Sequence, residues 1–212
     1  MSEHWPDIMN KVISKSIILA SKSPARLAMM QAAGIQLDAI APMVDEETIR
    51  QTMVAAGQTG RDLCDALAEA KAVKVSRKYP GTLVLGSDQI LESDDGDIIT
   101  KAETPAQAKR ILAALSGKPH RLYSAAVIAE GGQPVWRHVD KAVMKMRVLS
   151  ADFIDEYVGE YWEEIRPCVG CYRIEAEGAQ LFAKVDGSQF TVMGMPLLAV
   201  LDYLRVRGNL RS

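Results

Sequence analysis

A short segment near the start of the chain combines the signals of a buried strand, a tight turn and a helix start. This combination limits the fold more than any other stretch. Residues 17–20 form an apolar run too short for a helix, which predicts a strand. Ser23 is a favourable N-cap for a following helix, and Gly34 suits its C-terminal end. The free backbone N–H groups of such a helix start favour an anion, and Lys22 and Arg26 lie beside it in sequence. By itself this segment fits an ordinary strand–helix junction and a triphosphate-binding site equally well.

The length and composition of the chain limit the classes of protein to which it can belong. Its 212 residues, 48% of them hydrophobic, are enough for one domain with a substantial core. A net charge of −2 argues against a nucleic-acid or anionic-membrane partner, and no apolar run is long enough for a membrane span. The N-terminal residues lack the pattern of a secretory signal, and the odd number of cysteines fits a reducing compartment. We therefore expect a cytoplasmic protein in which residues 1–15 form a flexible arm and residues 16–212 a single domain.

The order of apolar segments, turn residues and helix signals predicts an α/β fold with a mixed sheet. Residues 82–86 form a β-type run that would bring Asp88 to a strand end, and residues 90–99 read as a hairpin. Residues 45–47 are acidic and read as the end of another strand, and residues 190–193 are expected to be extended. The remaining strands are expected at residues 35–44, 121–129, 135–148 and 180–185, and the helices at residues 24–33, 59–78, 105–115, 151–158 and 197–206. Strand 135–148 is expected to pair with strand 121–129, and Thr59 and Asp62 form a capping-box-like pair at the start of the second helix.

Cationic, hydroxyl and carboxylate side chains gather at the ends of these apolar elements. Cations and hydroxyls suit phosphate oxygens, whereas carboxylates suit a hard divalent cation that also binds substrate phosphates. Lys71 lies at the edge of an apolar helix stripe, so it either extends to solvent or points into a cleft at an anion. Together the set describes a site for a nucleotide triphosphate and its metal, in which a carboxylate activates water. Its members are Ser21, Lys22, Ser23, Arg26, Glu46, Lys71, Asp88, Gln89, Lys101, Glu175 and Glu177.

Several short motifs occur in a fixed order along residues 17–206. They are residues 19–26 (Leu-Ala-Ser-Lys-Ser-Pro-Ala-Arg), 44–46 (Val-Asp-Glu), 68–72 (Ala-Glu-Ala-Lys-Ala), 86–89 (Gly-Ser-Asp-Gln), Lys101 after the hairpin, 115–120 (Leu-Ser-Gly-Lys-Pro-His) and 192–197 (Val-Met-Gly-Met-Pro-Leu). Each motif is short, but their order and spacing make the chain resemble the Maf family of nucleoside triphosphate pyrophosphatases.

The resemblance implies an elongated α/β fold, a two-lobed mixed sheet with flanking helices around a central cleft, similar to inosine triphosphate pyrophosphatases. It implies hydrolysis of a nucleoside triphosphate to the monophosphate and pyrophosphate with a divalent metal, Mg²⁺ or Mn²⁺, as nucleotide-pool house-cleaning. Asp88 takes the place of the family's catalytic acid/base, and Glu46 and Asp88 take that of the metal-side carboxylates. The family's phosphate contacts fall on Ser21, Ser23, Arg26, Lys71 and Lys101.

Four positions bear on the choice of nucleobase, and they match neither branch of the family fully. The branch acting on dTTP and UTP has an arginine, a threonine and a glutamine where this chain has Ala25, Gln89 and Glu175. The branch acting on 7-methyl-GTP looks closer, although tryptophan commonly stands where Ala25 is. A carboxylate of Glu175 or Glu177 would accept hydrogen bonds from guanine N1–H and N2–H₂. A modified guanine nucleotide such as 7-methyl-GTP is therefore the expected substrate, with dTTP or UTP as the alternative.

Other functions fit parts of the sequence. A non-enzymatic nucleotide-binding regulator of septation would keep the cleft, but retention of Asp88 and its partners favours an enzyme. Cys168 and Cys171 form a Cys-x-x-Cys pair, but zinc needs two further ligands of suitable spacing, and a thioredoxin-like motif should open a helix. His120 fits either a phosphate neighbour or a plain residue at a strand start, and the second interpretation is preferred. Tyr161 and the tryptophan after it fit either a homodimer patch or a local core cap.

Overall fold

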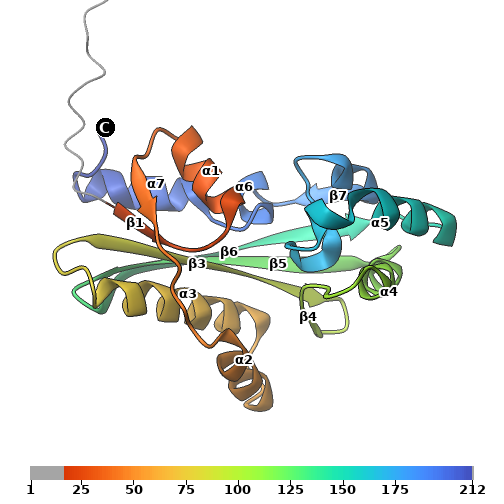
Figure 1. Ribbon diagram of the computed structural model, residues 1–212, viewed down its shortest axis with the longest axis horizontal. Helices are drawn as coiled ribbons and strands as arrows, with labels where there is room; N and C mark the ends of the chain where they lie inside the picture. The colour runs from red at the N-terminus through yellow and green to blue at the C-terminus, as the bar shows by residue number, and fades with distance from the viewer. Residues whose placement is uncertain (1–16, 212) are drawn as a thin grey trace, which may run out of the picture.

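A mixed sheet runs the length of the molecule in the computed structural model, which describes residues 17–211 (Figure 1). Its strands among these residues are β1 (Ile17–Ala20), β2 (Leu37–Ala39), β3 (Leu83–Ser93), β4 (Ile98–Ile99), β5 (Pro119–Glu130), β6 (Gln133–Met146) and β7 (Phe182–Asp186). They lie in the order β2-β1-β3-β5-β6-β7, with β4 paired to β3. β1 is parallel to β2 and β3, and the other neighbours are antiparallel.

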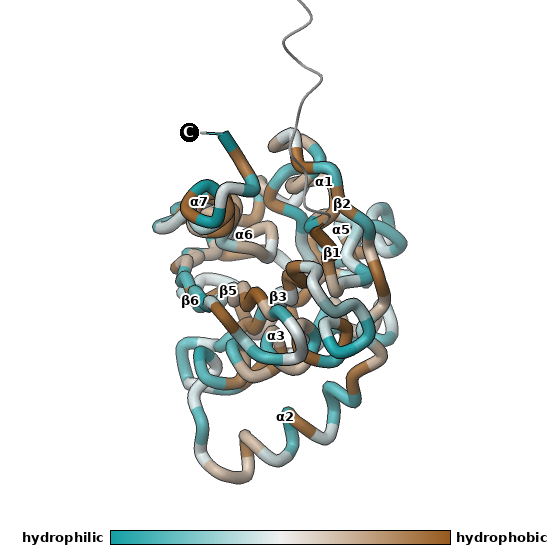
Figure 2. Tube along the Cα trace, turned by 90° about the vertical axis from the view of Figure 1, so that its left-hand side faces the viewer, coloured by the Kyte–Doolittle hydropathy of each residue, from teal (hydrophilic) through white to brown (hydrophobic). Residues whose placement is uncertain are grey.

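Helices cover both faces of this sheet. α3 (Gly60–Ser76) lies along one face, and α1 (Pro24–Ala32), α6 (Gln189–Val192) and α7 (Leu197–Val206) cover the other (Figure 1). α4 (Pro105–Leu115) and α5 (Ala151–Ile165) lie at the far end of the sheet. α2 (Glu46–Ala55) extends away from the sheet beyond α3 and has no buried residue (Figure 2). Two 3₁₀ turns, η1 (Val169–Cys171) and η2 (Glu177–Leu181), connect α5 to β7.

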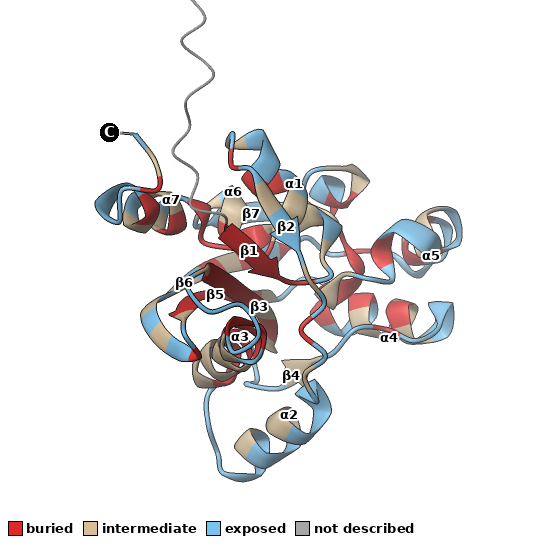
Figure 3. Cartoon of the chain, turned by 60° about the vertical axis from the view of Figure 1, so that its left-hand side comes forward, coloured by how far each residue is buried: buried red, intermediate tan, exposed pale blue. Residues whose placement is uncertain are grey.

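The buried segments of Figure 3 include β1, β3 and α3, and one hydrophobic core lies between α3 and the sheet. Two larger cores occupy the ends of the sheet. The first of these lies under α1 and α7, and the second lies between the sheet and α4 and α5. β3 supplies Leu85 to the first core and Leu91 to the second. β5 likewise supplies Leu122 to the second core and Ile128 to the first. These long strands tie the two ends together, which gives the elongated mixed α/β fold that the sequence predicts. Within the described part of the chain, no helix combines the length and the apolar character needed to cross a bilayer.

One edge of β3 is open between two neighbouring strands. β1 pairs with β3 only as far as the Ala20–Gly86 pair, and β4 begins at the Leu91–Ile99 pair. Between these points, among the described residues, no strand pairs with residues 87–90 on this edge, although β5 pairs with them on the other. Asp88 lies within this open stretch.

The predicted helix signals around the first helix and α3 are confirmed. The Ser23 hydroxyl accepts a hydrogen bond from the Arg26 amide, and Gly34 has the left-handed φ of 79° that ends α1. Thr59 and Asp62 form a capping box at the start of α3. The hairpin of β3 with β4 and the pairing of β5 with β6 also match the prediction.

Three predictions of local structure are wrong. Residues 45–47 do not end a strand, because Asp45 caps α2 and Glu46 lies in its first turn. Asp88 does not follow a strand, because β3 continues through it to Ser93. Residues 190–193 are not extended, because most of them belong to α6. β2 is also shorter and α5 longer than predicted. The predicted arm at residues 1–15 lies outside the described residues.

Candidate active site

A cleft of about 640 Å³ opens where the edge of β3 is free. Its floor contains Asp88 and Gln89 from the unpaired stretch of β3. The segment after β1 and the start of α1 form one side, and α2 and α3 supply Glu46 and Lys71. Residues 98–103 and 167–175 form most of the other end. The gap in strand pairing thus creates a cavity beside a polar segment of the central strand.

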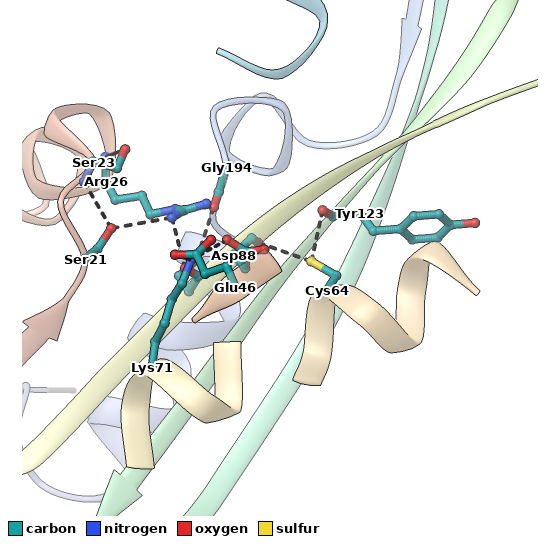
Figure 4. Close-up of polar contacts among 10 residues, drawn as sticks. Ser21, Ser23, Arg26, Glu46, Cys64, Lys71, Asp88, Tyr123 and Gly194 are labelled. Carbon is teal, nitrogen blue, oxygen red and sulfur yellow. Dashed lines mark hydrogen bonds and ion pairs between the residues drawn. The ribbon is translucent and has the colours of Figure 1, made fainter. Parts of the chain in front are cut away.

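Two carboxylates share one buried ammonium group in this cleft. Lys71 Nζ lies 2.6 Å from Asp88 Oδ1 and 3.0 Å from Glu46 Oε1 (Figure 4). The side chains of Lys71 and Asp88 are 7% and 10% exposed, whereas that of Glu46 is 49% exposed. Glu46 therefore approaches from the solvent side, and Lys71 points into the cleft rather than to solvent.

Gly86 allows α3 to bring Lys71 this close to the sheet. A Cβ atom at this position would lie 2.2 Å from the carbonyl oxygen of Ala68 and 2.6 Å from the amide nitrogen of Ala72. No larger residue fits there without moving α3, because backbone atoms cannot swing aside as side chains do. The glycine two residues before Asp88 therefore sets the distance between the strand and the helix turn that carries Lys71.

Arg26 is buried, and most of its guanidinium is already hydrogen-bonded. Nε donates to the carbonyl of Gly194 at 2.8 Å, and Nη1 donates to the carbonyl of Ser87 at 2.9 Å and to the Ser21 hydroxyl at 3.4 Å. The Ser87 hydroxyl donates to the same Gly194 carbonyl. Arg26 thus joins α1, β3 and the loop before α7 at the rear of the cleft (Figure 4).

Gln89 is tied to the same side of the protein. Its side-chain nitrogen contacts the carbonyls of Thr191 and Val192 and the hydroxyl of Ser124, at 2.9 to 3.2 Å. The Ser124 hydroxyl also donates to the Thr191 carbonyl. The amide nitrogen of Gln89 is therefore committed to holding α6 on the sheet.

The far end of the cleft rests on a buried tyrosine–histidine pair. Tyr172 lines the cleft, and its hydroxyl lies 2.7 Å from Nε2 of His120. His120 is fully buried, and this burial lowers its pKa to about 4. Its imidazole is therefore neutral at pH 7, and it is an interior residue rather than a phosphate neighbour.

A model of the Maf-like proteins matches residues 16–207, nearly the whole chain. The chain belongs to the Maf family. The resemblance noted from the sequence motifs is therefore confirmed over their full span.

Curated relatives match about nine-tenths of this Maf protein. A nucleoside triphosphate pyrophosphatase of Sphingopyxis alaskensis is 48% identical over 91% of this chain and 98% of its own length. A 7-methyl-GTP pyrophosphatase of Brucella abortus is 43% identical over 89% of this chain and 94% of its own. A solved dITP/XTP pyrophosphatase of Mycobacterium abscessus has a TM-score of 0.40 at 18% identity, covering 62% of this chain and 74% of that one. The predicted similarity to inosine triphosphate pyrophosphatases stays a prediction.

Most of the residues predicted for the Maf site line one cleft. Glu177 does not: it lies 3.6 Å from Arg173 in an ion pair, and it is absent from the cleft lining among the described residues. Of these two glutamates, Glu175 is therefore the one that lines the cleft. The predicted residues in the lining are Ser21, Lys22, Ser23, Ala25, Arg26, Glu46, Lys71, Asp88, Gln89, Lys101 and Glu175.

The sequence interpretation missed three cleft residues. Arg50 lies one turn after Glu46 on α2, so finding it required recognising that helix. Arg173 precedes Glu175 in an irregular loop, and Gly194 contributes its carbonyl rather than a side chain. The sequence signal for Arg50 is its spacing of four residues from Glu46, and that for Gly194 is its place in the motif at residues 192–197.

The cysteine pair has the properties of structural thiols. Cys168 and Cys171 are both free, and burial raises the pKa of each, that of Cys171 to about 12. Among the described residues, no three histidine, cysteine or carboxylate side chains gather as metal ligands. Both observations disfavour the redox and zinc interpretations.

Proposed function

We propose that this Maf protein cleaves the α–β phosphoanhydride bond of a nucleoside triphosphate, releasing the monophosphate and pyrophosphate. The observation that carries the proposal is the Glu46–Lys71–Asp88 cluster at the open edge of β3. Cations and hydroxyls lie on one side of this cluster and a mixed apolar and charged wall lies on the other. This arrangement fits a long ligand with a polyanionic end and a planar end. The names of the curated relatives support the same activity.

Asp88 is the proposed general base. Its carboxylate accepts a proton from the attacking water, and pyrophosphate leaves with the electron pair of the broken P–O bond. Lys71 orients this carboxylate at 2.6 Å and places a positive charge beside the phosphates. The exposed Lys22 neutralises the outer phosphate oxygens. Lys101, which lies with residues 98–103 at the other end of the cleft, would contact a phosphate oxygen nearer the base. Arg26 acts mainly by holding the rear of the cleft, with Nη2 left for a phosphate oxygen.

The carboxylates of Glu46 and Asp88 fit a divalent cation that arrives with its substrate. Both lie within 3.0 Å of the same ammonium group, so they face a common point. Two carboxylates are too few for a closed protein site, but Mg²⁺ typically uses one or two carboxylates together with substrate phosphates. Bound there, Mg²⁺ or Mn²⁺ would neutralise charge on the phosphates.

A guanine-type base, including 7-methylguanine, suits the far end of the cleft. The Glu175 carboxylate lines this end and is exposed, so it is free to accept from guanine N1–H and N2–H₂. A carboxylate also favours the positive charge of a 7-methylated ring. Gln89 makes a smaller contribution than the sequence predicts, because its amide nitrogen is bonded to α6.

The test is pyrophosphate release from 7-methyl-GTP, GTP, ATP, CTP, UTP and dTTP with Mg²⁺ or Mn²⁺. We expect turnover, with the highest kcat/KM for 7-methyl-GTP. The highest activity on dTTP or UTP would refute the assignment of the preferred nucleobase but would leave the proposed reaction standing. Tight binding of a nucleotide without turnover would instead support a non-enzymatic binder.

Asp88→Asn tests the role of Asp88 as the general base. We expect kcat to fall about 10²- to 10⁴-fold, because the neutral amide cannot accept the proton of the water. Asp202→Asn, an exposed change on α7, is the matched control and should keep wild-type activity. Wild-type kcat in Asp88→Asn would exclude Asp88 as the base.

A further inference from the structure

Residues 167–175, called here the base wall, close the cleft at the end opposite Ser21. They present Arg173, Ile174 and Glu175 to the cavity. Apart from the short η1, the base wall belongs to no helix or strand. The position of Glu175 therefore depends on what holds this irregular segment in place.

Backbone contacts alone hold the base wall weakly. The turns within it use hydrogen bonds such as the one from the Cys171 amide to the Cys168 carbonyl, at 3.3 Å. Gly170 and Cys171 both have left-handed backbone conformations, with φ of 77° and 59°. A non-glycine residue in this conformation is uncommon and needs support from its surroundings.

The side chain of Tyr172 provides that support from the side of the hydrophobic core. It is 5% exposed, and its ring packs edge-on against Phe182 of β7 at 4.7 Å between centroids. A Cβ atom at Gly170 would lie 2.6 Å from the Tyr172 ring and equally close to Leu91. The ring thus fills the space between the base wall and the core.

The hydroxyl of Tyr172 is fixed by one partner, Nε2 of His120 at 2.7 Å. His120 Nδ1 has no hydrogen-bond partner among the described residues. If Nε2 carried the proton, both the tyrosine proton and the Nδ1 lone pair would be unpaired in the interior. If the hydroxyl donates to Nε2, only the Nδ1–H is unpaired, and this arrangement costs less. The tyrosine therefore donates to a neutral imidazole that is anchored on β5.

We propose that His120 and Tyr172 are positioning residues for nucleobase selection, acting through the base wall. Their hydrogen bond links β5, whose residues pair with the strand that carries Asp88, to the segment that carries Glu175. It thereby fixes the base-recognising carboxylate relative to the reacting end of the cleft. This inference rests on the proposed function, because it assumes that a nucleotide base occupies the far end.

Tyr172→Phe tests the link by removing one oxygen atom. We expect KM for the preferred nucleotide to rise about fivefold to tenfold, in line with the loss of one hydrogen bond, while kcat changes less than about twofold. Selectivity is the ratio of kcat/KM between the best and the worst nucleotide of the panel. This ratio should fall by a similar factor. Tyr79→Phe, which removes the same atom from an exposed tyrosine beyond α3, is the matched control and should change neither value.

His120 gives an independent variant pair, which also serves if Tyr172→Phe fails to fold. His120→Gln keeps an acceptor for the tyrosine proton, whereas His120→Leu removes it. We expect the glutamine variant to recover part of the selectivity that the leucine variant loses. Equal selectivity in the two folded variants would overturn the proposal.

The outcomes separate this proposal from the proposed function. An active wild type with unchanged selectivity in Tyr172→Phe refutes the positioning role and leaves the reaction standing. A fall in kcat with unchanged KM and selectivity also refutes it. If the wild type turns over no nucleotide, the proposed function fails. Calorimetric Kd values for the same panel then decide the positioning role, which is refuted if Tyr172→Phe leaves their ratios unchanged.

Discussion

A single buried residue, His120, makes the stability of this protein depend on pH. Its folded-state pKa of about 4 lies below the value of 6.5 for a free imidazole, because the interior disfavours the charged ring. Between these values the unfolded chain binds a proton that the folded chain does not. The contribution of the neutral His120 to stability is therefore fully present above pH 6.5 and is lost as the pH falls toward 4.

We expect protonation of this histidine in the unfolded chain to lower the free energy of unfolding by about 3 kcal/mol between pH 7 and pH 4. Urea unfolding at a series of pH values measures the effect. His120→Gln should lose less stability over this range than the wild type, whereas His138→Gln, at an exposed position on β6, should follow the wild type. An NMR titration of His120 with a midpoint near 6.5 would contradict the prediction.

At the scale of elements, the contact between β3 and α3 determines the geometry of the candidate site. Gly86→Ala should destabilise the protein by about 1–3 kcal/mol and lower activity, because the added methyl pushes against the α3 backbone that carries Lys71. Thermal unfolding and pyrophosphate release measure the two effects.

Gly159→Ala is the matched control for that change. It lies in α5 with open space around the position of the added methyl, so alanine should stabilise the helix by about 0.5–1 kcal/mol. Full activity and wild-type stability in Gly86→Ala would show that α3 tolerates the methyl, against the geometry described above.

The elements that sequence patterns predicted well are those with local signals. α1 and α3 begin at Ser23 and Thr59, whose side chains cap their own helices, so a few adjacent residues define each start. α2 escaped prediction because it buries no residue and so shows no continuous apolar stripe. Its N-cap, Asp45, and the two glutamates of its first turn resemble the acidic end of a strand.

The interior of β3 shows why part of the site required the structure. Ser87 and Gln89 are polar and read as a strand end, but they bond to Gly194 and α6, about one hundred residues later in the chain. Lys71 and Asp88 were placed in one site by the sequence, but the ion pair between them comes from the structure alone. By contrast, Glu177 could not be told from Glu175 by sequence, because the pairing of Glu177 with Arg173 depends on the fold of the loop.

At the scale of the whole molecule, the cleft lies between two hydrophobic cores that share the long strands. A ligand that contacts both sides should therefore stabilise the protein as a unit. At 100 times its Kd, a non-hydrolysable α,β-methylene nucleotide with Mg²⁺ should add about 2.7 kcal/mol and raise Tm by about 5–10 °C.

Pyrophosphate with Mg²⁺ is the control for this measurement, because it occupies only the phosphate side. At the same concentration it should give a smaller rise in Tm than the nucleotide analogue. An equal rise would mean that the base wall contributes nothing to binding. Scanning calorimetry of the full chain compares the two ligands directly.

The position of Asp88 inside a long strand has a consequence for how such a protein can diversify. Its neighbours on β3 are held by β5 along the whole stretch, so insertions in surface loops do not reach it. The residues proposed to face the base lie instead on the irregular segment before β7. Changes of sequence or length there can alter which nucleotide is accepted while the reacting end keeps its geometry. New selectivities can thus evolve on an unchanged chemical step.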